Sequence, residues 1–173
     1  MDVPAIGPKR VRYLVPPVKF ALVHLSKPFD LAAVAQTAIA TGHVEIDFVG
    51  STLGLDHPKV DRKVASWNVD PESANKIATR RFDSIKELRA NSPNSRIIGT
   101  TVEGGHNPFN FDWQDDDIIV IGGANGLSKH DVESMDELIT IPTTPDTSFL
   151  TVSTVVPVLT YYILNQRMLF TES

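Results

Sequence analysis

Residues 118–131, IIVIGGANGLSKHD, carry the clearest structural signal in the chain. The apolar run 118–121 is typical of a buried strand, and Gly122, Gly123 and Gly126 follow it directly. Glycines at the carboxyl end of such a strand let the backbone approach a ligand closely, and open α/β sheets bind their ligands at that edge. A tight strand-to-helix turn would need the same residues, so the stretch alone predicts either a ligand loop or a structural turn.

Outward from this strand, short apolar strands alternate with helical segments. The further predicted strands are residues 18–25, 44–50, 96–102 and 137–142. An alanine-rich helix between the first two of them has Leu31, Val34, Ala35 and Ala38 on one face and Gly42 at its end, and a last helix covers about residues 149–167. This order predicts an α/β fold with a mostly parallel sheet of five or six strands and helices on both faces.

A further helical stretch is predicted over residues 71–93. Pro71 suits the first turn of a helix, Asp83 is a candidate cap for a restart, and Pro93 lies beyond the end. No repeat or linker divides the chain. Residues 18–173 are therefore expected to form a single domain, preceded by an N-terminal arm of residues 1–17.

The composition excludes several kinds of site. The absence of cysteine excludes disulfides, thiolate zinc sites and cysteine nucleophiles, and the five histidines lack the spacing of metal ligands, so no metal is expected. No stretch resembles a signal peptide or a membrane span, which predicts a soluble protein of the cytoplasm without a membrane partner. With 16 Lys+Arg and 21 Asp+Glu, the formal charge is −5, which leaves room only for a local basic patch.

Three segments, residues 26–42, 119–128 and 139–167, are similar to sequence motifs of one known protein family. Their order and separations resemble the three motifs of the SpoU/TrmH class of the SPOUT superfamily, S-adenosylmethionine-dependent RNA ribose 2′-O-methyltransferases. Ile141-Pro142 is followed at the family's spacing by FLTVS, residues 149–153, and the glycine turn matches the second motif with one residue fewer. A dinucleotide-binding fold fits less well, because its glycine motif should follow the first strand.

The resemblance implies more than a fold class. In the family the C-terminal segment, here residues 137–167, is threaded through a loop as a trefoil knot, an exception to the rule that chains do not thread loops. It also implies a homodimer that binds S-adenosyl-L-methionine and modifies structured RNA, either tRNA or rRNA. The apolar helix 31–39 offers a self-complementary surface for the dimer.

The glycine turn and the resemblance together predict a cofactor pocket. Backbone groups can bind adenine and ribose where side chains do not block the approach, which suits glycine turns and short Thr/Pro loops. The predicted lining is Thr100, Thr101, Gly122, Gly123, Gly126, Ile141, Pro142, Thr143 and Leu150. Valine at Gly123 is expected to weaken cofactor binding by at least ~1.4 kcal/mol while leaving the fold intact.

The sequence departs from the family where catalysis is concerned. The first motif has an asparagine and, six residues later, the arginine credited with activating the 2′-hydroxyl; the matching residues are Asp30 and Gln36. The asparagine of the third motif is Thr151. Glutamine lacks the fixed charge and five donors of arginine, so the catalytic residue stays unassigned. For Asp30 itself a helix N-cap is the simpler interpretation.

Two alternatives to an active methyltransferase remain at this stage. One is a catalytically inactive RNA- or protein-binding relative on the same scaffold, and the other is a nucleotide-binding enzyme of a different α/β family. The glycine turn is compatible with all three.

Candidate RNA contacts are few in an acidic chain. Phosphate contacts are predicted at Lys9, Arg10, Arg12, Arg80 and Arg81. The aromatic residues of the loop after the 96–102 strand are Phe109, Phe111 and Trp113. They could stack on unpaired bases, but a cluster that pins a long loop to the core is the commoner arrangement. His106 could face the substrate, although a solvated loop histidine is the simpler interpretation.

Overall fold

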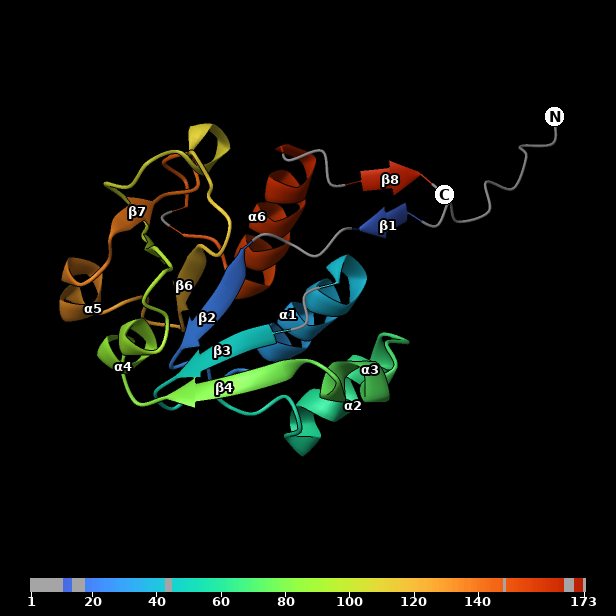
Figure 1. The fold of residues 1–173 in the computed structure, drawn as a ribbon. Helices are drawn as coiled ribbons and strands as arrows, with labels where there is room; N and C mark the ends of the chain where they lie inside the picture. The colour runs from blue at the N-terminus through green and yellow to red at the C-terminus, as the bar shows by residue number, and fades with distance from the viewer. Residues whose placement is uncertain (1–10, 14–17, 43–44, 148, 167–169, 173) are drawn as a thin grey trace, which may run out of the picture.

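The computed structural model describes residues 11–13, 18–42, 45–147, 149–166 and 170–172. Its main sheet has six parallel strands in the order β4-β3-β2-β6-β5-β7 (Figure 1). They are β2 (Lys19–Val23), β3 (Glu45–Val49), β4 (Ala78–Phe82), β5 (Ile97–Thr100), β6 (Ile118–Gly122) and β7 (Glu137–Ile139). The predicted α/β fold with a parallel sheet is confirmed.

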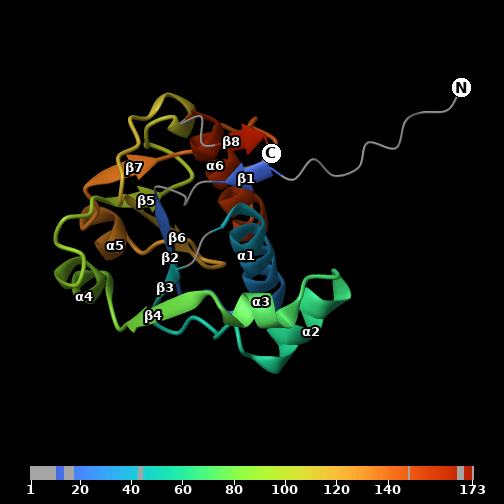
Figure 2. The ribbon, with the colours of Figure 1, turned by 45° about the vertical axis from the view of Figure 1, so that its right-hand side comes forward.

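Helices cover both faces of this sheet. On one face α1 (Pro28–Thr41) and α6 (Val152–Gln166) lie side by side, and α2 (Pro58–Ser66) and α3 (Pro71–Asn75) pack beside α1 (Figure 2). The predicted apolar face of α1 is buried here in the core of the chain, so it does not form the dimer surface suggested by the sequence, and Gly42 ends the helix in the left-handed conformation with φ +78°. On the other face, α4 (Ile85–Ala90) contributes to a smaller core, next to α5 (Lys129–Glu133).

A second, two-stranded sheet lies apart from the first. β1 (Val11–Tyr13) pairs antiparallel with β8 (Phe170–Glu172), so segments from the two ends of the chain lie next to each other (Figure 1). The domain boundary at residue 17 stays a prediction.

The region predicted as one helical stretch, residues 71–93, is divided into three elements. Helix α3 begins at Pro71 as predicted, but the chain then forms edge strand β4 before α4 begins. Ser84, rather than Asp83, is the N-cap of α4, and its hydroxyl accepts a hydrogen bond from the Glu87 amide at 3.2 Å. The sequence of β4, ATRRF, has no apolar alternation because most of the strand is exposed, and its pairing with β3 decides the structure.

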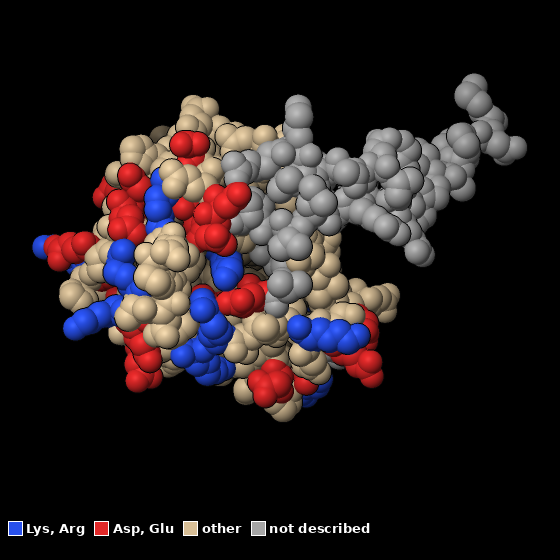
Figure 3. Space-filling view, viewed as in Figure 1, with Lys and Arg blue, Asp and Glu red and all other residues tan. Residues whose placement is uncertain are grey.

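An ion-pair cluster ties β4 to β3. Asp47 is fully buried and accepts two hydrogen bonds from Arg80, at 2.8 and 2.7 Å. Arg80 also lies 2.8 Å from Glu45, and its hydrogen bonds to Asp47 raise the pKa of the guanidinium. Positive and negative side chains are interspersed over the face that Figure 3 views. Because Asp47 and Glu45 both pair with Arg80, its charge is balanced within the chain, and the prediction that it contacts RNA phosphate is not supported.

The other predicted phosphate contacts have different outcomes. Arg81 donates to the Thr52 carbonyl at 2.8 Å and lies over the Phe48 ring. Lys9 and Arg10 lie outside the described residues, and Arg12 belongs to β1. None of the helices in the described part of the chain is long and apolar enough to span a membrane.

Candidate functional site

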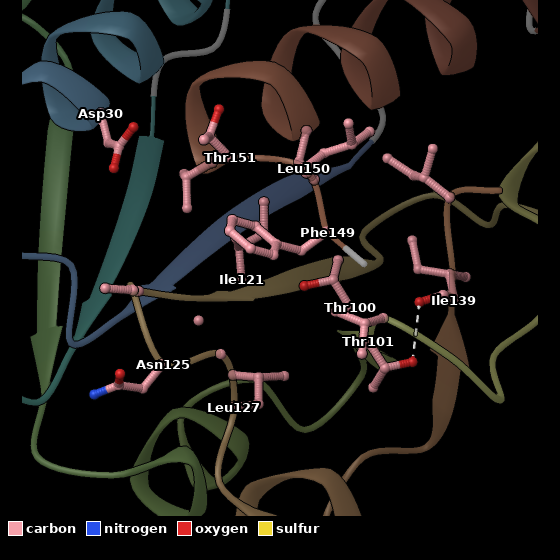
Figure 4. Close-up of a pocket in the computed structure, with 18 of the residues that line it drawn as sticks. Asp30, Thr100, Thr101, Ile121, Asn125, Leu127, Ile139, Phe149, Leu150 and Thr151 are labelled. Atoms are coloured by element: carbon pink, nitrogen blue, oxygen red, sulfur yellow. Dashed lines mark hydrogen bonds between the residues drawn. The ribbon is translucent and has the colours of Figure 1, made fainter. Parts of the chain in front are cut away.

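The main pocket lies at the carboxyl ends of the central strands. It has a volume of about 510 Å³ and receives residues that follow β2, β5, β6 and β7 (Figure 4). From β2 the chain proceeds to β3 on one side of the sheet, whereas from β6 it proceeds to β7 on the other side. Neighbouring strands whose connections diverge in this way leave a crevice between them, the usual ligand site of open α/β sheets.

The structure brings eight of the nine predicted cofactor residues to this pocket. They are Thr100, Thr101, Gly122, Gly123, Gly126, Ile141, Thr143 and Leu150. The exception is Pro142, which is exposed on the same loop and does not line the cavity. Residues far apart in the sequence therefore converge as the three-motif spacing predicted.

Several lining residues were not predicted from the sequence. Asn125 and Leu127 lie inside the glycine turn, and Lys27 lies inside the first motif segment, so the motif segments themselves contain all three. Val102, Ile121, Val132, Ile139, Phe149, Val152 and Val155 also line the cavity. These are apolar residues, and an apolar side chain in the sequence gives no sign of whether it faces a core or a cavity.

The glycines of the turn have a structural reason as well as a ligand one. A Cβ built on Gly122 would lie 2.3 Å from the Gly126 carbonyl carbon, and one on Gly123 would lie 2.4 Å from the His24 carbonyl oxygen. Backbone crosses backbone at both positions, so the expectation that Gly123→Val leaves the fold intact is wrong. Gly126 differs, since its Cβ would meet open space and only its φ of +68° requires glycine.

Hydrogen bonds of Thr100 and Thr101 connect the strand ends at the floor of the pocket. The Thr100 hydroxyl donates to the Val120 carbonyl at 3.0 Å, and the Thr101 amide donates to the Ile139 carbonyl at 2.9 Å. The Thr101 hydroxyl also lies 3.1 Å from that of Thr140. These bonds join the ends of β5, β6 and β7 and engage both threonine hydroxyls within the protein.

The start of α6 forms the rim opposite the glycine turn. Phe149 is 61% exposed there, and Leu150 is half-buried. Thr151 lines the cavity, and its hydroxyl lies 2.8 Å from that of Ser153 and 3.2 Å from that of Thr154. The third family-equivalent position is thus at the pocket.

The two family-equivalent positions of the first motif both lie on α1, but only one of them lines the pocket. Asp30 lines the pocket, whereas Gln36 is exposed further along the helix and is not among the lining residues. Asp30 is not the N-cap, as the sequence suggested. Helix α1 begins at Pro28 after Lys27, and the favourable φ of proline makes it a starting residue without help from a capping side chain.

The long loop between β5 and β6 packs onto the core through its aromatic residues. Phe111 and Trp113 are buried, and the Trp113 indole donates to the Pro108 carbonyl at 3.1 Å. Phe109 packs on Tyr162 of α6 with ring centroids 4.7 Å apart. The pinning role is confirmed for Phe111 and Trp113, which are not available to stack on RNA bases.

His106 lies outside the main pocket. Its side chain is 65% exposed and lies 3.2 Å from the Glu137 carboxylate. Within the described ranges, no group of three or more His, Asp or Glu side chains is arranged to hold a metal ion.

Comparison with known protein families identifies the family of this chain. The model of the SpoU rRNA methylase family matches residues 17–161. The chain belongs to the SpoU rRNA methylase family. This match covers the strands, the glycine turn and the start of α6 that build the pocket, so the SpoU/TrmH resemblance of the three segments is confirmed. Comparison with curated protein sequences gives no match.

Solved structures share the fold of this SpoU family member. The SpoU methyltransferase AviRb from Streptomyces viridochromogenes, in complex with the cofactor AdoMet, matches with a TM-score of 0.76 and 19% identity over 96% of this chain and 64% of that one. A solved structure that concerns the 2-OH methylation of C/U34 on tRNA matches with a TM-score of 0.75 and 19% identity, over 87% of this chain and 96% of that one. An AdoMet-bound rRNA methyltransferase from Sinorhizobium meliloti has a TM-score of 0.74 and 17% identity, covering 90% and 61%.

These likenesses concern the fold of the SpoU-type domain. The chain spans less than two thirds of the length of AviRb and of the S. meliloti protein. The chain from 138 to 140 does pass close to the 101–106 loop, because the His106 amide donates to the Leu138 carbonyl at 2.8 Å and a Cβ on Gly105 would lie 2.5 Å from the Ile139 carbonyl carbon. The trefoil knot and the homodimer stay predictions.

Proposed function

We propose that this protein is an S-adenosylmethionine-dependent RNA methyltransferase that binds its cofactor in the main pocket. The observation that carries the proposal is the convergence of the glycine turn, the Ile141 loop and the start of α6 on one cavity, in a chain of the SpoU family. Family membership supports the reaction class, and the cavity supports a cofactor of nucleoside size.

The pocket fits the chemistry of this cofactor. Its volume of about 510 Å³ lies within the roughly 300–1,000 Å³ of typical small-molecule sites. Gly123 and Gly126 line the cavity without a side chain, so a ligand can approach their backbone closely although both amides donate within the chain, and Ile141 and Leu150 supply apolar surface. S-adenosylmethionine, when bound, supplies an electrophilic methyl group on its sulfonium sulfur.

We place the methyl group on the ribose 2′-oxygen of a tRNA or rRNA nucleotide. This finer assignment is supported by the SpoU/TrmH-type motif order, and a tRNA 2-OH methylation structure shares the fold. The proposal includes a homodimer, which sedimentation of the purified protein will test. A protein that remains a monomer at micromolar concentration would contradict that part.

A surface beside the pocket suits an RNA strand. Lys27 lines the cavity, and Lys59 and Lys63 are one helical turn apart on α2. The Lys63 ammonium lies 5.9 Å from the ring of Phe29, which is 52% exposed and packs edge-on against Trp67. None of these three lysines is ion-paired with a described carboxylate, although Arg80, Arg89 and Arg96 are. Unpaired cations around an exposed aromatic ring can bind phosphates and stack a base.

The double variant Lys59→Glu/Lys63→Glu tests this surface. If both lysines contact phosphates, RNA affinity falls and the dependence of log K on log salt becomes shallower by about one to two units, because two counterion-releasing contacts are lost. Filter binding of total RNA at several salt concentrations measures both. The matched control, Lys86→Glu/Lys129→Glu, makes the same charge change on α4 and α5 and should alter the slope much less. Equal effects of the two variants would contradict the surface.

Leu150→Arg tests the cofactor site. The half-buried Leu150 contributes apolar surface to the cavity, and a guanidinium there would replace that surface with a charge and reduce the space for a ligand. We expect the affinity for S-adenosylmethionine, measured by calorimetry, to fall at least tenfold, about 1.4 kcal/mol. Leu150→Met preserves the apolar surface and should bind like the wild type. Equal affinity of the arginine variant, with an unchanged melting temperature, would place the cofactor elsewhere.

The second candidate is a catalytically inactive RNA-binding relative. Gln36, which stands where the family has arginine, favours it. Methyl transfer from labelled S-adenosylmethionine to total RNA distinguishes the two, since an inactive relative would bind RNA and transfer nothing.

A further inference from the structure

The pocket contains one buried carboxylate without a partner. Asp30 is only 9% exposed and lines the cavity, and it has no hydrogen bond or ion pair with any other residue in the described part of the chain. In Figure 4 it projects from the first turn of α1 on the same side of the cavity as Thr151. The Asp30 carboxylate oxygens are not enclosed by protein, so a ligand group in the cavity can reach them and act as the missing hydrogen-bond partner.

The rest of the lining offers no competing base. Among the residues around the cavity only Lys27 and Asp30 have side chains that carry a charge, and the others are glycine, threonine, asparagine and apolar residues. A lysine ammonium has no acceptor, whereas a carboxylate accepts up to four hydrogen bonds. Gln36 is both neutral and outside the lining. Asp30 is therefore the one lining side chain suited to take up a proton.

We propose that Asp30 is the catalytic proton acceptor of the methyl transfer, in place of the family's arginine. This inference rests on the proposed function. The ribose 2′-O–H bond breaks and its proton passes to the Asp30 carboxylate, while the ribose oxygen forms a bond to the methyl carbon. The methyl–sulfur bond breaks with its electrons remaining on sulfur, leaving a neutral thioether, a 2′-O-methyl ether and a protonated Asp30. Asp30 loses that proton to water when the products leave.

The position of Asp30 in the helix suits this role. It is an acidic residue in the first turn of α1, a helix of 14 residues, where the positive end of the helix dipole stabilises a carboxylate. The dipole favours the anion that must be present before the reaction.

A rival role would use the same carboxylate differently. S-adenosylmethionine carries an ammonium group on its methionine part, and Asp30 could bind that group instead of the ribose hydroxyl. The two roles differ in what a neutral isostere changes. Loss of an ammonium partner weakens cofactor binding, whereas loss of a base lowers the rate at saturating cofactor and leaves cofactor binding unchanged.

The decisive experiment compares the wild type with Asp30→Asn. Single-turnover transfer from labelled S-adenosylmethionine to total RNA should slow by roughly 100-fold or more at saturating cofactor, the usual contribution of a general base. The cofactor affinity from calorimetry should stay within about threefold, since the isostere keeps the shape of the pocket. Asp30→Glu should recover part of the rate. Asp56→Asn, the same change at an exposed aspartate outside the lining, should leave the rate unchanged.

The outcomes separate this inference from the function on which it rests. An Asp30→Asn rate within threefold of the wild type overturns the proton-acceptor role, as does a rate that is fully restored by more cofactor. A wild type that binds RNA and cofactor but transfers no methyl group overturns the proposed function itself, and the proton acceptor with it. Circular dichroism of each variant confirms that the comparison is between folded proteins.

Discussion

Gly122→Val is expected to lower the free energy of unfolding by about 3 kcal/mol and to abolish cofactor binding. A Cβ on Gly122 would lie 2.3 to 2.6 Å from backbone atoms of Gly126 and Leu127. The atoms of Gly126 and Leu127 that it would meet belong to the backbone and not to a flexible side chain, so the turn between β6 and α5 must move. Because that turn is one wall of the pocket, the movement would close or deform the proposed cofactor site. Urea denaturation and calorimetric titration measure the two effects.

Two alanine variants separate the clash from the backbone conformation. Gly126→Ala and Gly104→Ala introduce a Cβ into open space at φ +68° and +78°, so each should cost about 1 kcal/mol. Gly126 lines the main pocket and Gly104 does not. Only the Gly126 variant should therefore affect cofactor affinity. A Gly122→Val protein as stable as Gly104→Ala would show that the turn is far more adaptable than its contacts indicate.

Arg80→Met is expected to destabilise the fold by about 3 kcal/mol. The substitution removes both hydrogen bonds to Asp47, whose side chain is 0% exposed, and leaves a buried carboxylate without its counter-charge. Breaking a buried pair costs roughly 3–5 kcal/mol, and the lower value applies because the Arg80 side chain is itself 37% exposed, which lets water approach. The midpoint of urea denaturation measures the loss.

Two further proteins check the cause. Lys129→Met removes an exposed pair between Lys129 and Glu133 and should change stability by less than about 0.5 kcal/mol. The double variant Asp47→Leu/Arg80→Met removes the buried charge together with its partner and should recover much of the lost stability. If it is no more stable than Arg80→Met alone, the unpaired carboxylate is not the source of the effect.

Much of the fold could be predicted because the residues involved have local patterns. Apolar runs marked five of the six strands, periodic apolar residues marked α1, and the last helix was predicted close to the observed α6. Strand β4 had no such pattern, since an edge strand with exposed side chains needs no apolar alternation. It exists because its backbone pairs with β3 and because Arg80 meets Asp47, a residue 33 positions away.

The candidate site divides in a similar way. Motif spacing, together with the end of the predicted 96–102 strand, placed eight of nine predicted residues at the pocket, because these segments follow or end strands that meet at one edge of a parallel sheet. Motif spacing did not show whether Asp30 or Gln36 reaches the pocket, because both residues lie in the first motif segment. The helix decided between them: residues six apart on α1 face different directions, so Asp30 enters the cavity and Gln36 does not.

The sequence by itself therefore determined the fold class, the family and the edge of the sheet where the pocket forms, since each depends on patterns within a segment or on the spacing of segments. The tertiary structure alone decided which glycines are required by backbone contact, which cations are already paired, and which carboxylate lines the pocket without a protein partner. Those properties depend on distances between residues that are far apart in the chain. No local pattern encodes such distances, because they are fixed only when the strands and helices have packed.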